Sequence, residues 1–185
     1  MIVCGMDEAG RGPIAGPLSV AAVILPPNFP IDILNDSKAL SEKKRETAAS
    51  VIYKQAICVK HRFIDEATID RLNILQATLF GMQQLYLDLK ADGHTIDLVL
   101  VDGNKKPSIN CNTQAIIKGD TKIPQIMAAS IIAKTKRDHY MKEIALQYPL
   151  WQFEKHKGYP TKLHRELCKK YGLSEIHRKS FSIKV

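Results

Sequence analysis

The sequence predicts an α/β fold: a mixed sheet flanked by helices and followed by a C-terminal helical segment. The candidate elements run strand, strand, helix, strand, helix, strand, strand, helix and then a helical tail, with a Gly/Pro-rich turn between the first two strands. No internal repeat or Ser/Gly linker divides the 185 residues, of which 45% are hydrophobic and 25% charged. We therefore expect one domain, with a core over about residues 1–145 and a basic helical segment over about 146–185.

Five short apolar segments, most of them rich in β-branched residues, are the strand candidates. They are residues 2–7, 18–25, 57–63, 96–101 and 115–118. Because glycines and prolines fill the turn between the first two, these should form an antiparallel hairpin.

Helical periodicity and end signals define the helices between these strands. The first should begin at the N-cap residue Ser41 and end near residue 53, and the second carries a leucine-rich stripe over residues 72–89 that packs into the core. Proline suits the first turn of a helix, so a third should begin at Pro124. A fourth is expected over residues 161–171, stopped by a glycine.

Positive charge is concentrated in the second half of the chain. Residues 1–100 hold 10 basic and 12 acidic side chains, whereas residues 101–185 hold 17 and 7, and the formal net charge is +8. A basic lobe attracts polyanions such as nucleic acids, but a solvated lysine-rich face has the same composition. Charge alone leaves both interpretations open.

The chain lacks the features of a secreted or membrane protein. No run approaches the ~18 apolar residues of a membrane span, and no basic leader precedes the first strand, so we expect a cytoplasmic protein. The cysteines contain no Cys-x-x-Cys pair, which favours buried free thiols over zinc ligands or disulfides. They are Cys4, Cys58, Cys111 and Cys168.

Acidic residues beside glycines stand where strands end. Asp7 and Glu8 close the first strand, Asp102 closes the fourth, and Asp120 precedes the helix at Pro124. If the first and fourth strands are parallel neighbours, Asp7 and Asp102 meet at one sheet edge, where Glu8 and Asp120 could join them. Converging carboxylates repel unless they bind cations, and hard oxygen ligands suit Mg²⁺ or Mn²⁺. Two such ions would orient a water to attack a phosphodiester and stabilise its leaving oxygen. Taken singly, each carboxylate would more readily be a cap or turn residue, and the site is favoured only together with the motif that follows.

A Gly-Arg-Gly turn follows the first acidic pair directly. Gly10 and Gly12 allow close approach of the backbone to a ligand, and Arg11 between them can contact a phosphate. The spacing is not a dinucleotide-binding fingerprint, because prolines and a strand follow where a helix would be required. A plain hairpin turn is the alternative, but it would leave Arg11 beside two acids poorly explained.

Together these motifs resemble the type 2 ribonucleases H, specifically bacterial ribonuclease HII, over nearly the whole chain and in order. The matching segments are GMDEAGRGP (5–13), AGP (15–17), DSKALS (36–41), VDGN (101–104), KGD (118–120), AASIIAK (128–134), RD (137–138) and HKGYPT (156–161). The resemblance implies a ribonuclease H-like sheet with a C-terminal helical segment. It also implies an endonuclease that cuts the RNA strand of RNA/DNA hybrids and nicks duplex DNA 5′ of embedded ribonucleotides, in ribonucleotide removal.

The resemblance also assigns roles to single residues. The metal-binding and catalytic carboxylates would be Asp7, Glu8, Asp102 and Asp120. The ribose 2′-hydroxyl at the RNA-to-DNA junction would be read by the backbone of Gly10, Arg11 and Gly12, and Tyr159 would stack on the sugar of the following deoxynucleotide. The 2′-hydroxyl both donates and accepts hydrogen bonds, which suits backbone groups.

Basic side chains near these motifs are candidate contacts to the nucleic-acid backbone. They are Lys38, Lys134 and Arg137, with Arg165, Lys169 and Lys170 extending the basic face. Asp138 is interpreted as an ion-pair partner of Arg137, and His139 and His156 as local hydrogen-bonding residues. A solvated surface remains the alternative for each lysine.

The expected partners are RNA/DNA hybrids and ribonucleotide-containing duplex DNA, with no membrane and a monomeric chain. No glutamine and aromatic pair of a sliding-clamp peptide is visible in residues 177–185, and the few residues before Asp7 leave no room for the N-terminal domain of the type 3 enzymes. Three other interpretations compete: a hybrid-binding domain that no longer cuts, a junction resolvase and a sugar-kinase-like ATPase. The complete carboxylate set speaks against the first. The Gly-Arg-Gly turn speaks against the resolvase, and the missing phosphate loops speak against the ATPase.

Overall fold

A computed structural model describes residues 1–34 and 40–182. Its strands are β1 (Val3–Ala9), β2 (Leu18–Ile24), β3 (Cys58–Ile64), β4 (Leu98–Asp102) and β5 (Thr113–Ile116). Its α-helices are α1 (Glu42–Gln55), α2 (Glu66–Leu72), α3 (Ile74–Ala91), α4 (Pro124–Ala145), α5 (Phe153–His156) and α6 (Lys162–Tyr171), with 3-10 turns η1 (Ile31–Ile33), η2 (Gly119–Thr121) and η3 (Pro149–Trp151). Lys38, a predicted contact to the nucleic-acid backbone, lies outside the described residues. So do residues 183–185, the end of the tail in which no sliding-clamp peptide is expected.

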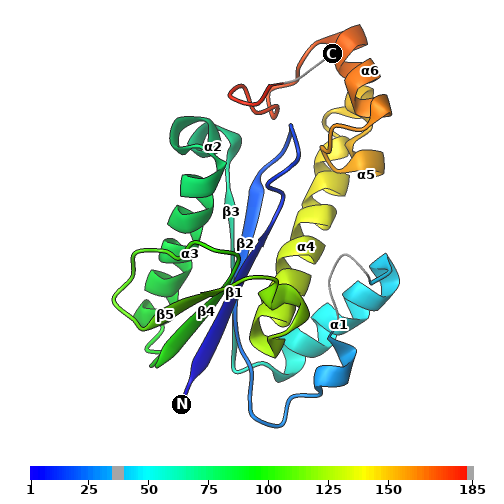
Figure 1. Cartoon of the computed structure of the whole chain (residues 1–185). Coiled ribbons are helices and arrows are strands. Elements are labelled where there is room, and N and C mark those ends of the chain that lie inside the picture. The colour runs from blue at the N-terminus through cyan, green and yellow to red at the C-terminus, as the bar shows by residue number, and fades with distance from the viewer. Residues whose placement is uncertain (35–39, 183–185) are drawn as a thin grey trace.

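The five strands form one mixed sheet in the order β3-β2-β1-β4-β5 (Figure 1). Strand β1 pairs antiparallel with β2 and parallel with β4, and Met6 lies opposite Val101. The predicted hairpin and the predicted parallel pairing of the first and fourth strands are therefore confirmed. As a result, the carboxyl ends of β1 and β4 lie side by side.

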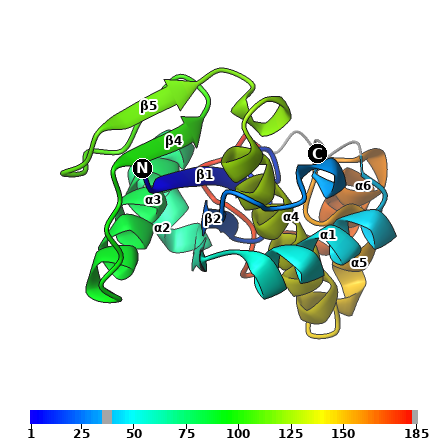
Figure 2. The ribbon, with the colours of Figure 1, turned by 90° about the horizontal axis from the view of Figure 1, so that it is seen from below.

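Helices cover both faces of the sheet (Figure 2). Successive residues of a strand point to opposite faces, so Val20 of β2 packs in the cluster with α3, while its neighbour Ala21 packs in the cluster with α1 and α4. Strand β1 follows the same alternation. A Cβ atom at Gly5 would lie 2.2 Å from the carbonyl carbon of Gln125 in α4. Glycine thus allows α4 to lie directly against the strand that carries the first acidic residues.

Most predicted elements are confirmed, with corrections in the leucine-rich helix and in the last strand. The Asn73 backbone has a positive φ (67°) with an extended ψ (163°), which interrupts the helix, and its side chain accepts a hydrogen bond from the Gln76 N–H, so α2 ends and α3 begins there. The Asn73 side chain caps the new helix, which apolar spacing alone does not reveal. Strand β5 also begins and ends two residues earlier than predicted, since the left-handed Lys118 turns the chain into η2.

The C-terminal segment returns to the loop that joins β1 and β2 (Figure 1). The backbone N–H of Gly16 donates to the carbonyl of Ile176, and the backbone N–H of Arg178 donates to the carbonyl of Ile14. A small apolar cluster around Phe153 joins α4, α5 and this tail. Two segments distant in sequence therefore hold the loop that contains the Gly-Arg-Gly turn.

All four cysteines are free thiols, as predicted, but only two of them are buried. Cys4 and Cys168 are buried, whereas Cys58 and Cys111 are partly exposed. Within the described ranges, the helices are all too short or too polar to cross a bilayer.

Candidate active site

Three carboxylates meet at the edge of the sheet where β1 and β4 end. Each of Asp7, Asp102 and Asp120 offers one oxygen, and the three oxygens all lie within 4.8 Å of one another. Asp7 and Asp120 are buried, and Asp102 is partly exposed. The Asp120 N–H donates to Asp102 Oδ1 over 3.2 Å, which fixes η2 against the end of β4. The structure thus brings together three of the four predicted carboxylates as one group.

Asp7 lies in a strongly perturbed electrostatic environment. Burial, and then the negative charges of Glu8 and Asp102, raise the pKa of Asp7 well above the usual range of an aspartate. The Glu8 N–H, 2.7 Å from Asp7 Oδ1, and the Ser130 hydroxyl of α4 act in the opposite direction. Ser130 is a site residue that sequence reasoning did not select, although it lies inside the motif AASIIAK. Its contact with Asp7 depends on the packing of α4 on β1.

Glu8 lies beside the three clustered carboxylates, outside their 4.8 Å group. Neighbouring residues of a strand point to opposite faces, and Glu8 accordingly faces the hollow bordered by Asp102, Asn104 and Lys105. Its carboxylate lies 3.7 Å from the Arg11 guanidinium, and it is only 13% exposed. Glu8 therefore connects the acidic cluster to the Gly-Arg-Gly turn.

The donor set fits a hard divalent cation. All three clustered ligands are carboxylates, and Mg²⁺ and Mn²⁺ prefer such oxygens. A buried aspartate with a raised pKa beside two further acids is costly to ionise, and a cation between them would offset that cost. The predicted metal residues thus match the chemistry of the predicted ions.

The Gly-Arg-Gly turn borders a hollow of about 210 Å³ next to the acidic cluster. Its walls are Glu8, Ala9, Gly10, Arg11, Gly12, Ser130, Lys134 and Tyr159. The Tyr159 ring is 36% exposed and lies near the turn, since a Cβ atom at Gly12 would be 3.7 Å from Tyr159 Cε1. Residues predicted separately for ribose reading and for sugar stacking therefore line one hollow.

Arg137 requires a correction. It was predicted to contact the nucleic-acid backbone, but it is only 1% exposed. Its guanidinium donates to the carbonyls of Pro17, Ala15 and Lys157 over 2.8–3.0 Å. The side chain points inward because α4 packs against the loop, so Arg137 ties the loop to the Lys157 turn instead of reaching a phosphate.

Asp138 forms a structural ion pair, as predicted, but with different partners. Its carboxylate accepts from Arg45 of α1 at 2.9 Å and from Lys134 at 2.8 Å, whereas Arg137 on the other side of the helix bonds only carbonyls. Lys134 keeps 20% of its side chain exposed, with Nζ 5.7 Å from the centre of the Tyr159 ring. It thus remains able to reach a phosphate at the hollow.

A second cluster of potential ligands lies behind Tyr159 but is satisfied by hydrogen bonds. His164 Nδ1 donates to the Tyr159 carbonyl (2.9 Å), and His177 Nδ1 accepts the Ser174 N–H (2.8 Å). The proton of neutral His177 is therefore on Nε2, which lies 3.1 Å from His164 Nε2 and 3.2 Å from Cys168 Sγ. A metal would need the lone pair of that nitrogen, so the cluster is a hydrogen-bond network.

His139 and His156 make hydrogen bonds, as was predicted for them. His139 bonds Glu46 over 2.9 Å, and His156 bonds the Trp151 carbonyl over 2.8 Å.

The buried histidines predict a loss of stability in mild acid. Burial lowers the pKa of His164 and His177 to about 4, against about 6.5 in an unfolded chain. Between these values the unfolded chain binds protons that the folded chain does not, so the free energy of unfolding falls as pH falls from about 6.5 to about 4. Each histidine contributes up to about 1 kcal/mol per pH unit.

Urea denaturation at several pH values between about 7 and 4.5 measures this slope. His164→Asn should flatten it, whereas His139→Asn, at an exposed histidine on α4, should leave it as in the wild type. Parallel pH profiles for the wild type and His164→Asn would contradict the assignment.

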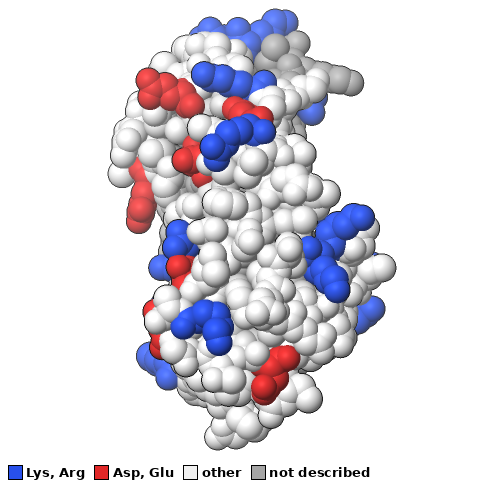
Figure 3. All heavy atoms as spheres, turned by 90° about the vertical axis from the view of Figure 1, so that its left-hand side faces the viewer, with Lys and Arg blue, Asp and Glu red and all other residues white. Residues whose placement is uncertain are grey.

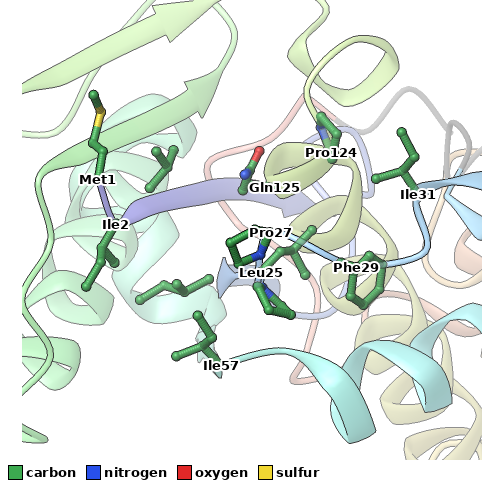
Figure 4. A pocket seen from close by; sticks show the side chains of 12 residues that line it. Met1, Ile2, Leu25, Pro27, Phe29, Ile31, Ile57, Pro124 and Gln125 are labelled. Carbon is green, nitrogen blue, oxygen red and sulfur yellow. The ribbon is translucent and has the colours of Figure 1, made fainter.

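Among the described residues, no other part of the surface has a comparable group of carboxylates. On the face over α2, α3 and β5, basic and acidic groups are interspersed and separated by uncharged surface (Figure 3). An apolar hollow of about 340 Å³ lies where β1 begins, at the opposite end of that strand from Asp7 (Figure 4). Side chains such as Leu25, Phe29 and Ile57 line it, and none of its lining side chains carries an ionisable group.

Solved structures of ribonucleases H share this fold. One is the ribonuclease HII of Archaeoglobus fulgidus in complex with PCNA, with a TM-score of 0.83, 23% identity and coverage of 100% of this chain and 97% of that one. Another is Bst-RNase HIII in complex with Mn²⁺, with a TM-score of 0.82, 17% identity and coverage of 98% and 67%. At these identities the likeness concerns the fold.

Sequence comparisons identify the family. The family model of ribonuclease HII matches residues 4–184. The ribonuclease HII of Janthinobacterium sp. (strain Marseille) is 49% identical over 98% of this chain and 85% of its own length, and that of Francisella philomiragia is 50% identical over 98% and 96%. The chain belongs to the ribonuclease HII family. It is a ribonuclease H, an enzyme that acts on RNA/DNA hybrids.

Proposed function

We propose that this ribonuclease H also nicks duplex DNA on the 5′ side of an embedded ribonucleotide, leaving a 3′-hydroxyl and a 5′-phosphate, and so removes ribonucleotides from DNA. The observation that carries the proposal is the shared position of Glu8, which lines both the Gly-Arg-Gly hollow and the hollow at Asp102. A ribose held at the turn would therefore have its flanking phosphodiester next to the carboxylates.

Asp7, Asp102 and Asp120, with Glu8 beside them, would hold Mg²⁺ or Mn²⁺, and we propose two ions during catalysis. Such ions lower the pKa of water and stabilise negative charge on a leaving oxygen. The protein contributes the positions of its oxygens: the Glu8 N–H orients Asp7, and the Asp120 N–H orients Asp102. Burial beneath α4 keeps the group in a medium where its charges act strongly.

The hollow supplies the groups that distinguish a ribonucleotide. The 2′-hydroxyl is the feature of the sugar that separates RNA from DNA at one position, and the backbone of Gly10, Arg11 and Gly12 would bind it. Tyr159 would stack on the next deoxyribose, and Lys134 would contact a phosphate. This arrangement would favour binding of an RNA-to-DNA junction over binding of plain DNA, because plain DNA has no 2′-hydroxyl for the turn to bind.

A cleavage assay tests the proposal directly. A labelled DNA duplex carrying one ribonucleotide is incubated with the purified protein and Mg²⁺ or Mn²⁺, and the product ends are mapped. We expect one nick, 5′ of the ribonucleotide, that requires the metal and is absent from an all-DNA duplex. Full activity in EDTA, or equal cutting of the all-DNA duplex, would refute the proposal.

A further inference from the structure

A fully buried arginine of the C-terminal tail holds the Gly-Arg-Gly turn from behind. The Arg178 side chain is 0% exposed. Its Nη2 donates to the Gly10 carbonyl over 2.7 Å, Nη1 to that of Arg11 over 3.2 Å, and Nε to that of Gly16 over 2.9 Å. One planar guanidinium thus spans both ends of the loop between β1 and β2.

Burying this arginine carries a large desolvation penalty. Among the residues that the structure describes, it has no ion-pair partner, and burial together with the charge of Arg137 lowers its pKa to about 9. Moving a cation out of water is unfavourable, and three neutral carbonyls compensate for it only in part. A buried apolar residue would contribute to the stability of the tail without that cost, so the three directed hydrogen bonds point to a role in shaping the turn.

The direction of the turn's polar groups indicates what that role is. Its Gly10 and Arg11 carbonyls face Arg178, whereas the N–H groups of Arg11 and Gly12 donate to no other described part of the protein. Gly10 adopts φ +98°, and a Cβ atom there would lie 2.1 Å from Nε of Arg137. The two carbonyls are therefore bound from behind, which leaves the two N–H groups for a ligand in the hollow that the turn lines.

We propose that Arg178 is a positioning residue for ribose recognition. By binding the carbonyls of Gly10 and Arg11, it fixes the peptide planes of the turn so that the Arg11 and Gly12 N–H groups point at the 2′-hydroxyl. Arg137 has a different task, because it binds the second half of the loop and the Lys157 turn. The inference rests on the proposed function and extends it to the C-terminal tail.

The test compares binding of two duplexes that differ only in one 2′-hydroxyl. Dissociation constants for a single-ribonucleotide duplex and for the all-DNA duplex are measured with Ca²⁺ in place of the catalytic ion. In Arg178→Lys and Arg178→Met, we expect the preference for the ribonucleotide to fall at least fivefold, with the all-DNA value unchanged within twofold. Lysine keeps the charge but cannot bridge three carbonyls, so it should not rescue the preference.

Lys179→Ala is the matched control, since it removes one positive charge from the adjacent exposed residue. It should weaken both duplexes alike and keep the preference. Added guanidinium ion should restore the preference of Arg178→Ala, and equimolar sodium should not.

Four outcomes would overturn the inference. They are a wild-type preference in Arg178→Lys, an equal weakening of both duplexes, failure of guanidinium to restore the preference, and failure of every Arg178 variant to fold, which would assign the residue to stability alone. Equal binding of both duplexes by the wild type would instead refute the proposed function, and this inference with it.

Discussion

Replacing Asp102 by asparagine should abolish cleavage and leave substrate binding nearly intact. The amide is isosteric with the carboxylate, and its oxygen can still accept the Asp120 N–H, so the geometry at the end of β4 persists. What disappears is one negative charge among three oxygens that lie within 4.8 Å of one another. Loss of a preorganised electrostatic group costs on the order of 1000-fold in kcat, and a missing metal ligand should cost at least that much.

Single-turnover cleavage and fluorescence anisotropy separate the two effects of this variant. The cleavage rate should fall below detection, while the dissociation constant of the hybrid stays within a fewfold of the wild type, because the basic surface is untouched. Asp97→Asn is the matched control: Asp97 immediately precedes β4, at its other end, and accepts from the Ile2 N–H. It should cut at the wild-type rate. Near-normal turnover of Asp102→Asn would disprove the assignment of the acidic cluster.

The sequence was sufficient to predict the acidic cluster because the site follows from local signals and one pairing. Each carboxylate adjoins a strand end or a glycine, and the parallel pairing of β1 with β4 places Asp7 and Asp102 together. The position of Glu8 on the other face follows from strand alternation, but only once β1 is known to continue to Ala9. The family motifs then assigned the roles.

The loop supports were not predictable in the same way. Arg137 was predicted to contact a phosphate, and no role was predicted for Arg178. Both side chains bind carbonyls of the same loop. A buried arginine without an acidic partner has no periodic or spacing signal, and its contacts join residues more than a hundred positions apart. Ser130 was not predicted as a site residue for the same reason, because its contact with Asp7 depends on the approach of α4 to β1 at Gly5.

Removing the Tyr159 ring should selectively impair cleavage at single ribonucleotides. The ring's backbone is fixed on both sides: its N–H donates to the His156 carbonyl (2.9 Å), and its carbonyl accepts from His164 Nδ1 (2.9 Å). Gly158 before it adopts φ +84°, and a Cβ atom there would lie 2.2 Å from the Ala15 carbonyl oxygen. These contacts aim the ring at the hollow, so its loss removes a preformed stacking surface.

Tyr159→Ala should therefore lower kcat/KM for a single-ribonucleotide duplex by about 5- to 150-fold, from stacking of about 1–3 kcal/mol. Tyr159→Phe should retain most of the activity, because it keeps the ring beside Lys134. Tyr53→Ala is a suitable control, since this exposed tyrosine lies on α1, away from the lining of the hollow.

Rates are compared on a single-ribonucleotide duplex and on a long hybrid, in which no deoxyribose follows the cleaved position. Equal losses on both substrates would mean that the ring supports the fold of the turn and not the junction. Unchanged rates would make Tyr159 a surface aromatic without a part in recognition.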